Sequence, residues 1–446
     1  MLYWITKPIA YIFYHIYYKI AYRGLENIPD NQPVVFAPNH VNAFIDPVIL
    51  GVLTRRKIRF YARGDVFKSR IAKAALNSWS ISPMFRLQEG YGEIKKNEKS
   101  FLECRNLLMD SKVVLLFPEA ICIQERRLAP LKKGLSRIVF QAEEALDFKK
   151  EIWIVPVGLN YSAAWKFRSK FYIEIGKPIS VSEYEARFKQ DKVRAINEFT
   201  KALEQKMPAY MVIINNPNND ILFDDLVDIY LPEWIKEKGG DPKDLHHQND
   251  ATKEMAAMVN HLETQHPDLL NELKEKVVPY SKLLKEEGLR DHLLYPETIS
   301  KMNFFSFIAE SQIILWGSIL YFFGLLTNYP PYFLAKRFSD KKVKNIEFYA
   351  SAYLHISMFV WLFYFGVQLL TVALVFRNWS LLGLYAFTVI LMGYFNLWYY
   401  PVRKKIFGRW RLLRMVQKQR TTVEQLINTR AEIIDLIKEA KGLFVD

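Results

Sequence analysis

The sequence predicts an α/β fold with a helical insert and a C-terminal transmembrane helical region, and three observations support this. Within 33–177, short β-branched or aromatic runs alternate with longer segments of mixed polarity, which is typical of a sheet flanked by helices. Residues 181–300 are rich in Lys, Glu and Asp and have a helical pattern. Three strongly apolar segments follow, each long enough to cross a hydrocarbon core of about 30 Å.

The N-terminal segment 1–24 is crowded with aromatic side chains and has Lys7 and Lys19 as the only charges before Tyr22. A cleavable signal peptide would need a basic start, an aliphatic centre and a small-residue cleavage site, and the segment has none of them. We therefore expect an interfacial N-terminal helix over 1–24.

The α/β domain is expected over 25–180. Its candidate strands are 34–37, 58–62, 113–117, 152–159 and 171–175, and the helices between them are 47–53, 69–79, 98–109 and 135–145. Ligands of open α/β sheets collect at the carboxyl ends of strands. Motifs that follow these strands are therefore expected to meet at one site.

The rest of the chain is divided by its changes in composition. The predicted parts are a helical insert or lobe at 181–300, a membrane region at 301–402 and a basic cytoplasmic tail helix at 403–446. Three full crossings would place the Lys-rich loop 336–344 and the tail opposite the α/β domain, against the positive-inside tendency. A re-entrant first segment that turns back at 328–331, followed by a helical hairpin, keeps all basic regions on the cytoplasmic face. We expect this second arrangement.

The formal net charge of +14 indicates an anionic partner. Residues 403–420 hold eight Lys or Arg and no acidic residue, directly after an aromatic stretch, which favours a juxtamembrane segment on anionic lipid over a merely solvated basic helix. No common nucleic-acid-binding module is recognisable, so nucleic acid is not an expected partner. Cys104 and Cys122 are the only cysteines, which excludes a disulfide framework.

A histidine and a carboxylate follow the first candidate strand, where Asn39 and His40 precede Asp46. On a continuous helix these six steps would put His40 and Asp46 on different faces, so they can meet only across a turn. A carboxylate that holds one ring nitrogen leaves the other to take a proton from an alcohol. The pair therefore indicates a general base and its orienter, and the alternative is that Asp46 only caps a helix.

Three further motifs follow later strands. They are Arg86 after the apolar Ile81, then Phe117, Pro118 and Glu119, and then Pro156 within Val-Pro-Val-Gly. Alone, Arg86 is compatible with a surface ion pair and Glu119 with a helix cap.

Together, the four motifs resemble the glycerol-phosphate and lysophosphatidate acyltransferase superfamily over 33–178. The resemblance implies a glycerolipid-acyltransferase-like mixed sheet, with His40 as the general base and Asp46 as its orienter. Five residues separate His40 from Asp46 here, where the family commonly has four. This longer spacing is similar to that of a branch that includes the yeast-type glycerol-3-phosphate acyltransferases.

The resemblance also implies substrate-binding roles, with Arg86 on the acceptor's phosphate and Pro156 on the acyl-donor side. Ala120 stands where the family's third block usually has glycine, so Arg126 and Arg127 are added candidates for phosphate contacts. The predicted substrate-binding residues are Asn39, Arg86, Phe117, Pro118, Glu119, Lys132, Lys133 and Pro156.

The expected function is a membrane-bound O-acyltransferase that uses no metal or cofactor. It would move a fatty acyl group from acyl-CoA or acyl carrier protein to glycerol 3-phosphate or lysophosphatidate, with the α/β domain on the cytoplasmic face. Two alternatives remain open at this point. One is an acyltransferase for another lysophospholipid or an aminolipid, and the other is a non-catalytic membrane scaffold with a decayed site.

Overall fold

The computed structural model describes residues 2–67, 70–84, 97–295, 298 and 304–445. The chain forms two compact units. The first contains Met1–Ile213 together with Val343–Leu354, and the second contains Ile214–Lys342 together with His355–Asp446.

Within the described residues, eight strands of the first unit form one mixed sheet, as the sequence predicted. The strand order is β1-β7-β6-β2-β5-β3-β4, and β8 pairs with β6. Strands β7 and β8 run antiparallel to β6, and the other pairs are parallel. The strands are β1 (Lys19–Arg23), β2 (Val34–Pro38), β3 (Ile58–Arg63), β4 (Ile81–Met84), β5 (Val113–Leu115), β6 (Trp153–Tyr161), β7 (Lys170–Ile175) and β8 (Ile179–Ser180).

The sequence predicted the interior strands and missed three outer ones. Strand β2 is buried at all five positions and lies between β5 and β6, so its continuous apolar run fits a strand covered on both faces. The missed strands lack such a run. Strand β1 is a partly exposed edge, β4 is an edge that contains Pro83, and β8 has two residues.

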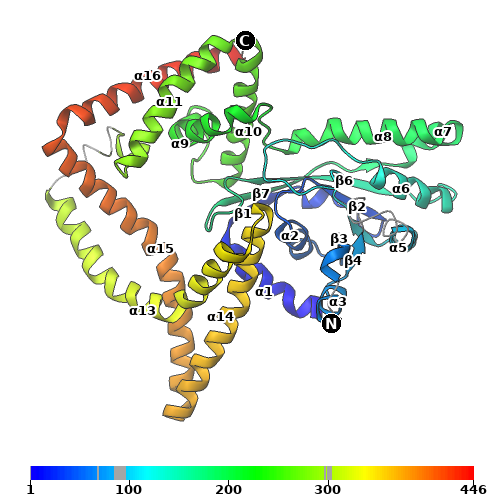
Figure 1. Ribbon diagram of the computed structural model, residues 1–446, viewed down its shortest axis with the longest axis horizontal. Helices are drawn as coiled ribbons and strands as arrows, with labels where there is room; N and C mark the ends of the chain where they lie inside the picture. Colours follow the sequence, from blue (N-terminus) through cyan, green and yellow to red (C-terminus); the bar gives the residue numbers. More distant parts are fainter. Residues whose placement is uncertain (1, 68–69, 85–96, 296–297, 299–303, 446) are drawn as a thin grey trace. The chain divides into compact units, whose positions relative to one another are not determined.

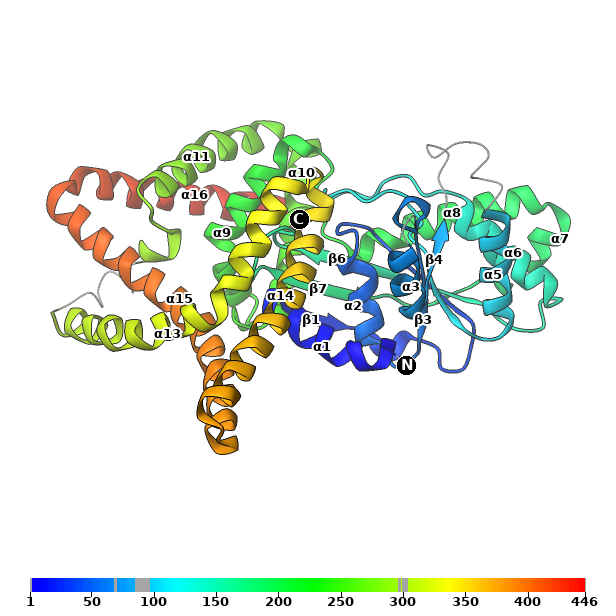
Figure 2. The ribbon, with the colours of Figure 1, turned by 60° about the horizontal axis from the view of Figure 1, so that its bottom comes forward.

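Helices cover both faces of the sheet (Figure 1, Figure 2). Helices α1, α2 and α3 lie over one face, and α6, α7 and α8 lie over the other with α5 packed beside α6. Their bounds are α1 (Leu2–Tyr17), α2 (Ile45–Leu53), α3 (Arg70–Ser78), α5 (Asn97–Met109), α6 (Gly134–Ala145), α7 (Glu185–Gln190) and α8 (Lys192–Lys206).

The first unit extends beyond the predicted domain end at residue 180. Phe188 of α7 and Phe199 and Leu203 of α8 belong to the same buried cluster as Val35 and Ile154 of the sheet. Burial of these side chains makes α7 and α8 part of the α/β core. The compact unit therefore ends at Ile213, and the segment predicted as an insert from 181 begins inside the core.

The N-terminal segment holds a helix and a strand. Helix α1 ends at Tyr17, and β1 begins at Lys19, where it pairs in parallel with β7. One face of α1 is buried through Tyr3, Tyr14 and Tyr17. Its other face exposes large apolar side chains, namely Trp4, Ile5, Tyr11 and Ile12.

The second unit is helical within the described residues. Its helices are α9 (Asp220–Glu237), α10 (Leu245–Gln265), α11 (Pro267–Glu286), α13 (Phe304–Lys342), α14 (Ile346–Phe376), α15 (Trp379–Lys418) and α16 (Arg420–Val445), and the first turns of α14 belong to the first unit. The sequence predicted one basic tail helix over 403–446, whereas the structure has the end of α15 and a second helix, α16, in this region. Helix α15 continues to Lys418, and α16 buries Leu426, Ile433 and Ile437 because it packs on α10 and α11.

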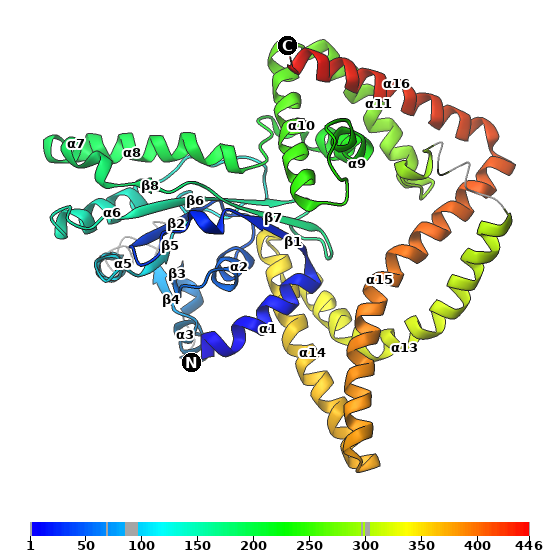
Figure 3. The same cartoon turned by 180° about the vertical axis from the view of Figure 1, so that it is seen from behind.

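Helices α13, α14 and α15 are each long and apolar enough to cross a membrane. Helices α14 and α15 are joined at Arg377 and Asn378, and Asn378 caps α15 by accepting the amides of Ser380 and Leu381. Helix α13 contains Pro330 and Pro331 and bends near its middle (Figure 3). Proline removes the amide that would bond to the carbonyl four residues earlier, so two carbonyls at this bend lose their helical partners.

Side chains of α14 pair with these two carbonyls. The Tyr364 hydroxyl donates to the carbonyl of Leu326 at 3.1 Å, and Gln368 Nε2 donates to that of Thr327 at 3.0 Å. These are the carbonyls freed by Pro330 and Pro331, four residues earlier in each case. Backbone polar groups in an apolar environment need such partners, so these bonds make the bend compatible with lipid surroundings.

Candidate active site

The turn predicted between β2 and α2 brings His40 and Asp46 together. His40 Nδ1 lies 3.0 Å from Asp46 Oδ2, although six positions separate the two residues. Asp46 is in the first turn of α2 and is fully buried. Its carboxylate accepts bonds from groups that precede the helix and does not cap the amides of α2, so the helix-cap alternative does not describe it.

Four donors converge on the Asp46 carboxylate. Besides the His40 ring, Oδ2 accepts the backbone amides of Val41 and Asn42, each at 2.7 Å. Oδ1 accepts the Tyr161 hydroxyl at 2.6 Å. Burial and the nearby Asp46 carboxylate raise the pKa of Tyr161 well above its usual value, so the phenol keeps the proton that it donates.

The His40 ring is held on two sides. It stacks on the Phe117 ring, with 3.6 Å between ring centroids and 16° between planes. An Nδ1–H that donates to Asp46 fixes the tautomer in which Nε2 carries a free lone pair. The side chain of His40 is 11% exposed, so the arrangement offers a nearly buried proton acceptor at the end of β2.

Glu119 lies beneath this turn as an anchor for two backbone segments. Its carboxylate accepts the amide of His40 at 3.0 Å and that of Ala129 at 2.8 Å. Burial raises its pKa to about 7, while these two amides lower it. Because neither amide belongs to a helix terminus, the helix-cap alternative for Glu119 fails as well.

Ala120, which stands where the family's third block usually has glycine, has a backbone conformation that favours glycine. Its φ is +56°, in the left-handed region that favours glycine, and its amide donates to the carbonyl of Phe117 at 3.1 Å. Phe117 to Ala120 therefore form a tight turn with Pro118 and Glu119 at its centre.

Three predicted site residues are buried, and two of them, Asn39 and Pro156, pair within the sheet. Both amide groups of Asn39 bond to the backbone of Leu159, so this side chain joins β2 to β6. Pro156 is buried within β6 opposite Ala37. Pro118 is buried, and its carbonyl accepts the amide of Lys132 at 2.8 Å.

Four of the predicted phosphate-binding residues lie in the segment 126–133. Lys132 and Lys133 are exposed beside the beginning of α6. Arg126 donates to the carbonyl of Ser162 at 3.5 Å, and Arg127 pairs with Glu125 at 2.9 Å. Arg86 lies outside the described residues.

Sequence reasoning missed Tyr161 and Gln124. Tyr161 ends β6, which runs parallel to β2, so the rule that placed His40 at the carboxyl edge of the sheet could also have found Tyr161. Gln124 carries no such signal. Its Nε2 donates to Asn42 Oδ1 at 3.1 Å from a loop that follows the third motif.

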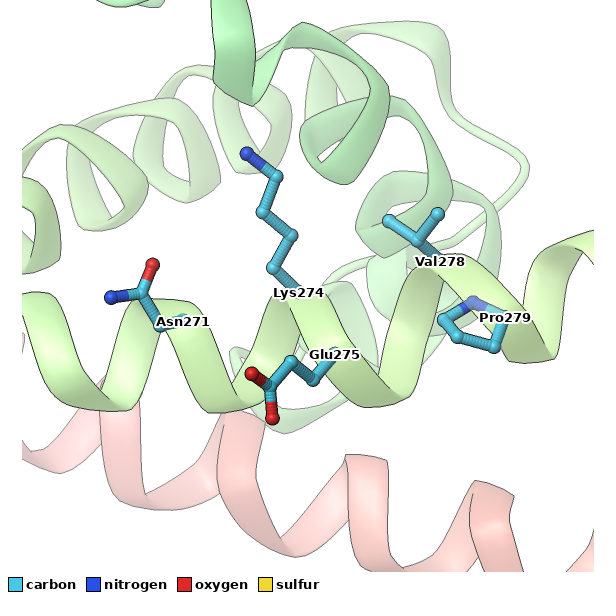
Figure 4. A pocket seen from close by; sticks show the side chains of 5 residues that line it. All are labelled: Asn271, Lys274, Glu275, Val278 and Pro279. Carbon is cyan, nitrogen blue, oxygen red and sulfur yellow. The ribbon is translucent and has the colours of Figure 1, made fainter.

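Other parts of the molecule offer weaker candidates. Among the described residues, His, Cys, Asp and Glu form no group of three that could hold a metal ion. A shallow hollow on α11 in the second unit is shown in Figure 4 and contains none of the predicted site residues. Its lining residues are Asn271, Lys274, Glu275, Val278 and Pro279.

Comparisons with known proteins agree with the motifs. The Acyltransferase family model matches residues 19–160. Glycerol-3-phosphate O-acyltransferase 2 of Saccharomyces cerevisiae is 24% identical over 260 residues, which are 57% of this chain and 34% of that protein. The chloroplastic 1-acyl-sn-glycerol-3-phosphate acyltransferase LPAT1 of Arabidopsis thaliana is 29% identical over 131 residues, 29% of this chain and 35% of that protein.

The matched region thus spans about a third of the length of these curated relatives. Among solved structures, the 1-acyl-sn-glycerophosphate acyltransferase PlsC of Thermotoga maritima aligns with a TM-score of 0.32 and 15% identity, over 45% of this chain and 78% of that chain. The family match covers β1 to β6 and includes His40, Asp46 and Glu119. Residues 19–160 therefore form an acyltransferase domain, and this domain is similar to parts of proteins named glycerol-3-phosphate and 1-acyl-sn-glycerol-3-phosphate acyltransferases.

Proposed function

We propose that this protein is a membrane-bound O-acyltransferase that moves a fatty acyl group from an acyl thioester to a hydroxyl of glycerol 3-phosphate or lysophosphatidate. The observation that carries the proposal is the His40–Asp46 contact, which leaves Nε2 of a nearly buried imidazole as a proton acceptor at the carboxyl edge of the sheet. The names of the relatives supply the acceptor class.

The proposed reaction needs one base and an activated acyl donor. His40 Nε2 takes the proton of the acceptor hydroxyl while the oxygen attacks the thioester carbonyl, which gives a tetrahedral oxyanion. The C–S bond then breaks, and the leaving thiolate takes the proton from the His40 imidazolium. The ester and the free thiol are the products, and Asp46 keeps the ring oriented through both steps.

Charge and apolar surface support the choice of substrates. The acceptor and the carrier are both phosphorylated, and the chain has a formal net charge of +14. Lys132 and Lys133 follow the motif that contains Glu119, and we propose that they and Arg86 attract these phosphates. The exposed apolar face of α1 would lie on the lipid surface, where acyl chains collect.

We also propose that the α/β unit faces the cytoplasm and that α13 is re-entrant, turning at Pro330 and Pro331. Single cysteines in a variant without Cys104 and Cys122 test this topology. Lys177→Cys and Lys341→Cys, both at exposed positions, should be labelled from the same side of the membrane, and Asn378→Cys from the other. Labelling of Lys341→Cys from the side opposite Lys177→Cys would mean that α13 crosses fully.

An acceptor screen on the purified full chain tests the activity. Radiolabelled acyl-CoA is offered with glycerol 3-phosphate, lysophosphatidate, other lysophospholipids and an aminolipid. The wild-type protein should form labelled ester with one of the first two acceptors, and His40→Ala should lower the rate about 10²–10⁴-fold. His246→Ala, at an exposed position of α10, is the matched control and should keep the wild-type rate.

Three results would change the assignment. Transfer to another lysophospholipid or to an aminolipid alone would keep the enzyme class and replace the acceptor. Absence of transfer to every acceptor would favour a membrane scaffold. An unchanged rate in His40→Ala would contradict the proposed base.

A further inference from the structure

A segment about 300 positions later in the chain accepts hydrogen bonds from the loop between His40 and Asp46. This segment, Val343–Leu354, contains the first turns of α14 and belongs to the first compact unit together with the loop. The beginning of α14 lies beside α2 in all three ribbon views (Figures 1 to 3).

Four consecutive backbone amides of this loop have partners, and the partners come from two sources. Asp46 accepts the first two amides, those of Val41 and Asn42. Helix α14 accepts the next two, because the amide of Ala43 donates to the carbonyl of Glu347 and that of Phe44 to Ser351 Oγ, each at 3.1 Å. Ala43 and Phe44 are half-buried, and α14 supplies two of the four acceptors that these loop amides use.

Gln124 links the same two segments from a third direction. Its Nε2 donates both to Asn42 Oδ1 and to the carbonyl of Ile346, each at 3.1 Å. The Phe44 ring also meets the Phe348 ring edge to face, with 6.1 Å between centroids.

Burial makes this contact specific. Ser351 is 1% exposed, its neighbour Ala350 is fully buried and Asn42 is fully buried. The Ser351 hydroxyl itself is shielded from water, while the Phe44 side of the bond is half-buried. Loss of the hydroxyl would therefore leave the amide of Phe44 without this acceptor, two residues before Asp46.

We propose that Ser351 is a positioning residue for the His40–Asp46 pair, acting with Gln124 through the loop 41–44. This inference rests on the proposed function, in which His40 is the base. It also relates α14 to the five-residue interval between His40 and Asp46, since two of the amides in this interval that do not reach Asp46 are accepted by α14. Ser351 acts through the loop and has no contact with the reacting atoms in this proposal.

The test compares Ser351→Ala with Ser357→Ala in the purified full chain. Ser357 lies on the same helix and is fully buried, and its hydroxyl has no hydrogen-bond partner among the described residues, so it is a matched control. For Ser351→Ala we expect kcat per folded molecule to fall about tenfold, with KM for donor and acceptor within about twofold of wild type. Ser357→Ala should stay within about twofold in both constants.

A second measurement does not depend on activity. Hydrogen exchange of the peptide that contains 41–44 should be about tenfold faster in Ser351→Ala and unchanged in Ser357→Ala, while a peptide from α6 should exchange equally in both. Gln124→Ala, at a half-buried loop position, should raise the same exchange rate about threefold and remains informative if Ser351→Ala does not fold.

The outcomes separate the two proposals. If wild type transfers no acyl group but exchange changes as expected, α14 holds the loop and the proposed function fails. If wild type is active and both serine variants match it in kcat and exchange, the inference is overturned and the proposed function stands. A change confined to KM, or equal losses in Ser351→Ala and Ser357→Ala, would also overturn the inference.

Discussion

The His40–Asp46 turn and the bend of α13 both have backbone groups without partners in regular secondary structure, and α14 pairs with both. At the turn, α14 offers acceptors to two amides, through the carbonyl of Glu347 and Ser351 Oγ. At the bend it offers donors to two carbonyls, through Tyr364 and Gln368. The helix therefore presents acceptors near its beginning and donors near its middle.

The two regions differ in the charge of their hydrogen-bonding groups and in whether a group remains free to accept a proton. At the bend, the hydrogen bonds join neutral groups, and Asn328 adds bonds to Trp361 and to the carbonyl of Val389. At the turn, a buried carboxylate accepts bonds from four donors, and one imidazole nitrogen has no hydrogen-bond partner among the described residues. A closed neutral network stabilises a shape, whereas an open charged one can also take up a proton. Changes at the turn should therefore appear in kcat, and changes at the bend in stability.

The largest expected effect is that of Asp46→Asn. An amide would place an N–H group where a carboxylate oxygen now accepts, so it cannot satisfy all four donors, and the His40 tautomer would no longer be fixed. We expect kcat to fall about 10³-fold. Steady-state rates with acyl-CoA and the preferred acceptor check this. A fall in kcat smaller than tenfold would mean that the turn, like the bend, contributes to stability alone.

The next effect is a pH dependence of stability from Glu119, the other buried carboxyl group at the turn. Its folded pKa is about 7 against an ordinary 4.5, so the folded state holds the proton more tightly than the unfolded state. This contribution is full below pH 4.5, is lost as pH rises through about 7 and amounts to about 3 kcal/mol, from 2.5 pKa units at 1.36 kcal/mol each. Thermal unfolding between pH 5 and 8 should show this loss in wild type.

Glu119→Gln is the control for that measurement. The variant cannot titrate at this position. As pH rises from 5 to 8, the unfolding free energy of wild type should therefore fall relative to that of the variant. The His40 and Ala129 amides bond to different oxygens of Glu119, and Gln places an NH2 group at one of these two positions, which adds a penalty that does not vary with pH. Parallel pH curves for the two proteins would contradict the raised pKa.

A smaller effect on rate is expected from Tyr161→Phe. The change removes one of four donors to Asp46 and keeps the ring that stacks on Phe171 at 3.8 Å. We expect kcat to fall about tenfold, which corresponds to about 1.4 kcal/mol, with little change in unfolding temperature. Tyr22→Phe, on the exposed edge strand β1, should leave both values unchanged. If the loss in Tyr161→Phe appeared in unfolding temperature alone, the distinction between the two regions would not hold.

The sequence predicted the interior of the sheet and the His40–Asp46 contact because both depend on local patterns. The strand β2 has an uninterrupted apolar run, and the turn after it has the residues that turns prefer. The place of Glu119 beneath His40 followed from the rule that parallel strands end at one edge. The same rule could have reached Tyr161.

Other features depend on contacts between distant segments, which one sequence does not reveal. The inclusion of α7 and α8 in the first unit rests on burial of Phe188 and Phe199 against the sheet. The role of Ser351 required knowledge that a position 307 residues after Phe44 lies against it. At the bend of α13, the two prolines were visible in the sequence, but their partners Tyr364 and Gln368 were not.

Breaking the bend should cost stability and leave catalysis intact. Gln368→Leu leaves the carbonyl of Thr327 without its donor and the Tyr385 hydroxyl without its acceptor, and we expect unfolding free energy to fall by about 1 kcal/mol. Thr371→Val is the control on the same helix, because within the part of the chain that the structure describes the Thr371 hydroxyl donates to the carbonyl of Val367 one turn earlier and to no side chain or backbone group of another helix. Denaturation in detergent measures both variants. A fall in kcat per folded molecule in Gln368→Leu would show that the two regions are not separate in their effects.

The smallest expected effect is a gain in stability at the edge of the turn, from Ala120→Gly. Alanine at a φ of +56° carries a conformational cost of about 1–2 kcal/mol that glycine avoids, and the greater freedom of glycine in the unfolded chain offsets about 0.4–1 kcal/mol of that gain. The net result should be an increase of about 0.5–1 kcal/mol in unfolding free energy, with kcat within about twofold of wild type. Chemical denaturation resolves such a difference from the shift in midpoint. A loss of stability would mean that the methyl group of Ala120 has a favourable contact that outweighs the backbone strain. The expected gain would mean that the turn Phe117–Ala120 carries backbone strain that the His40–Asp46 pair does not need.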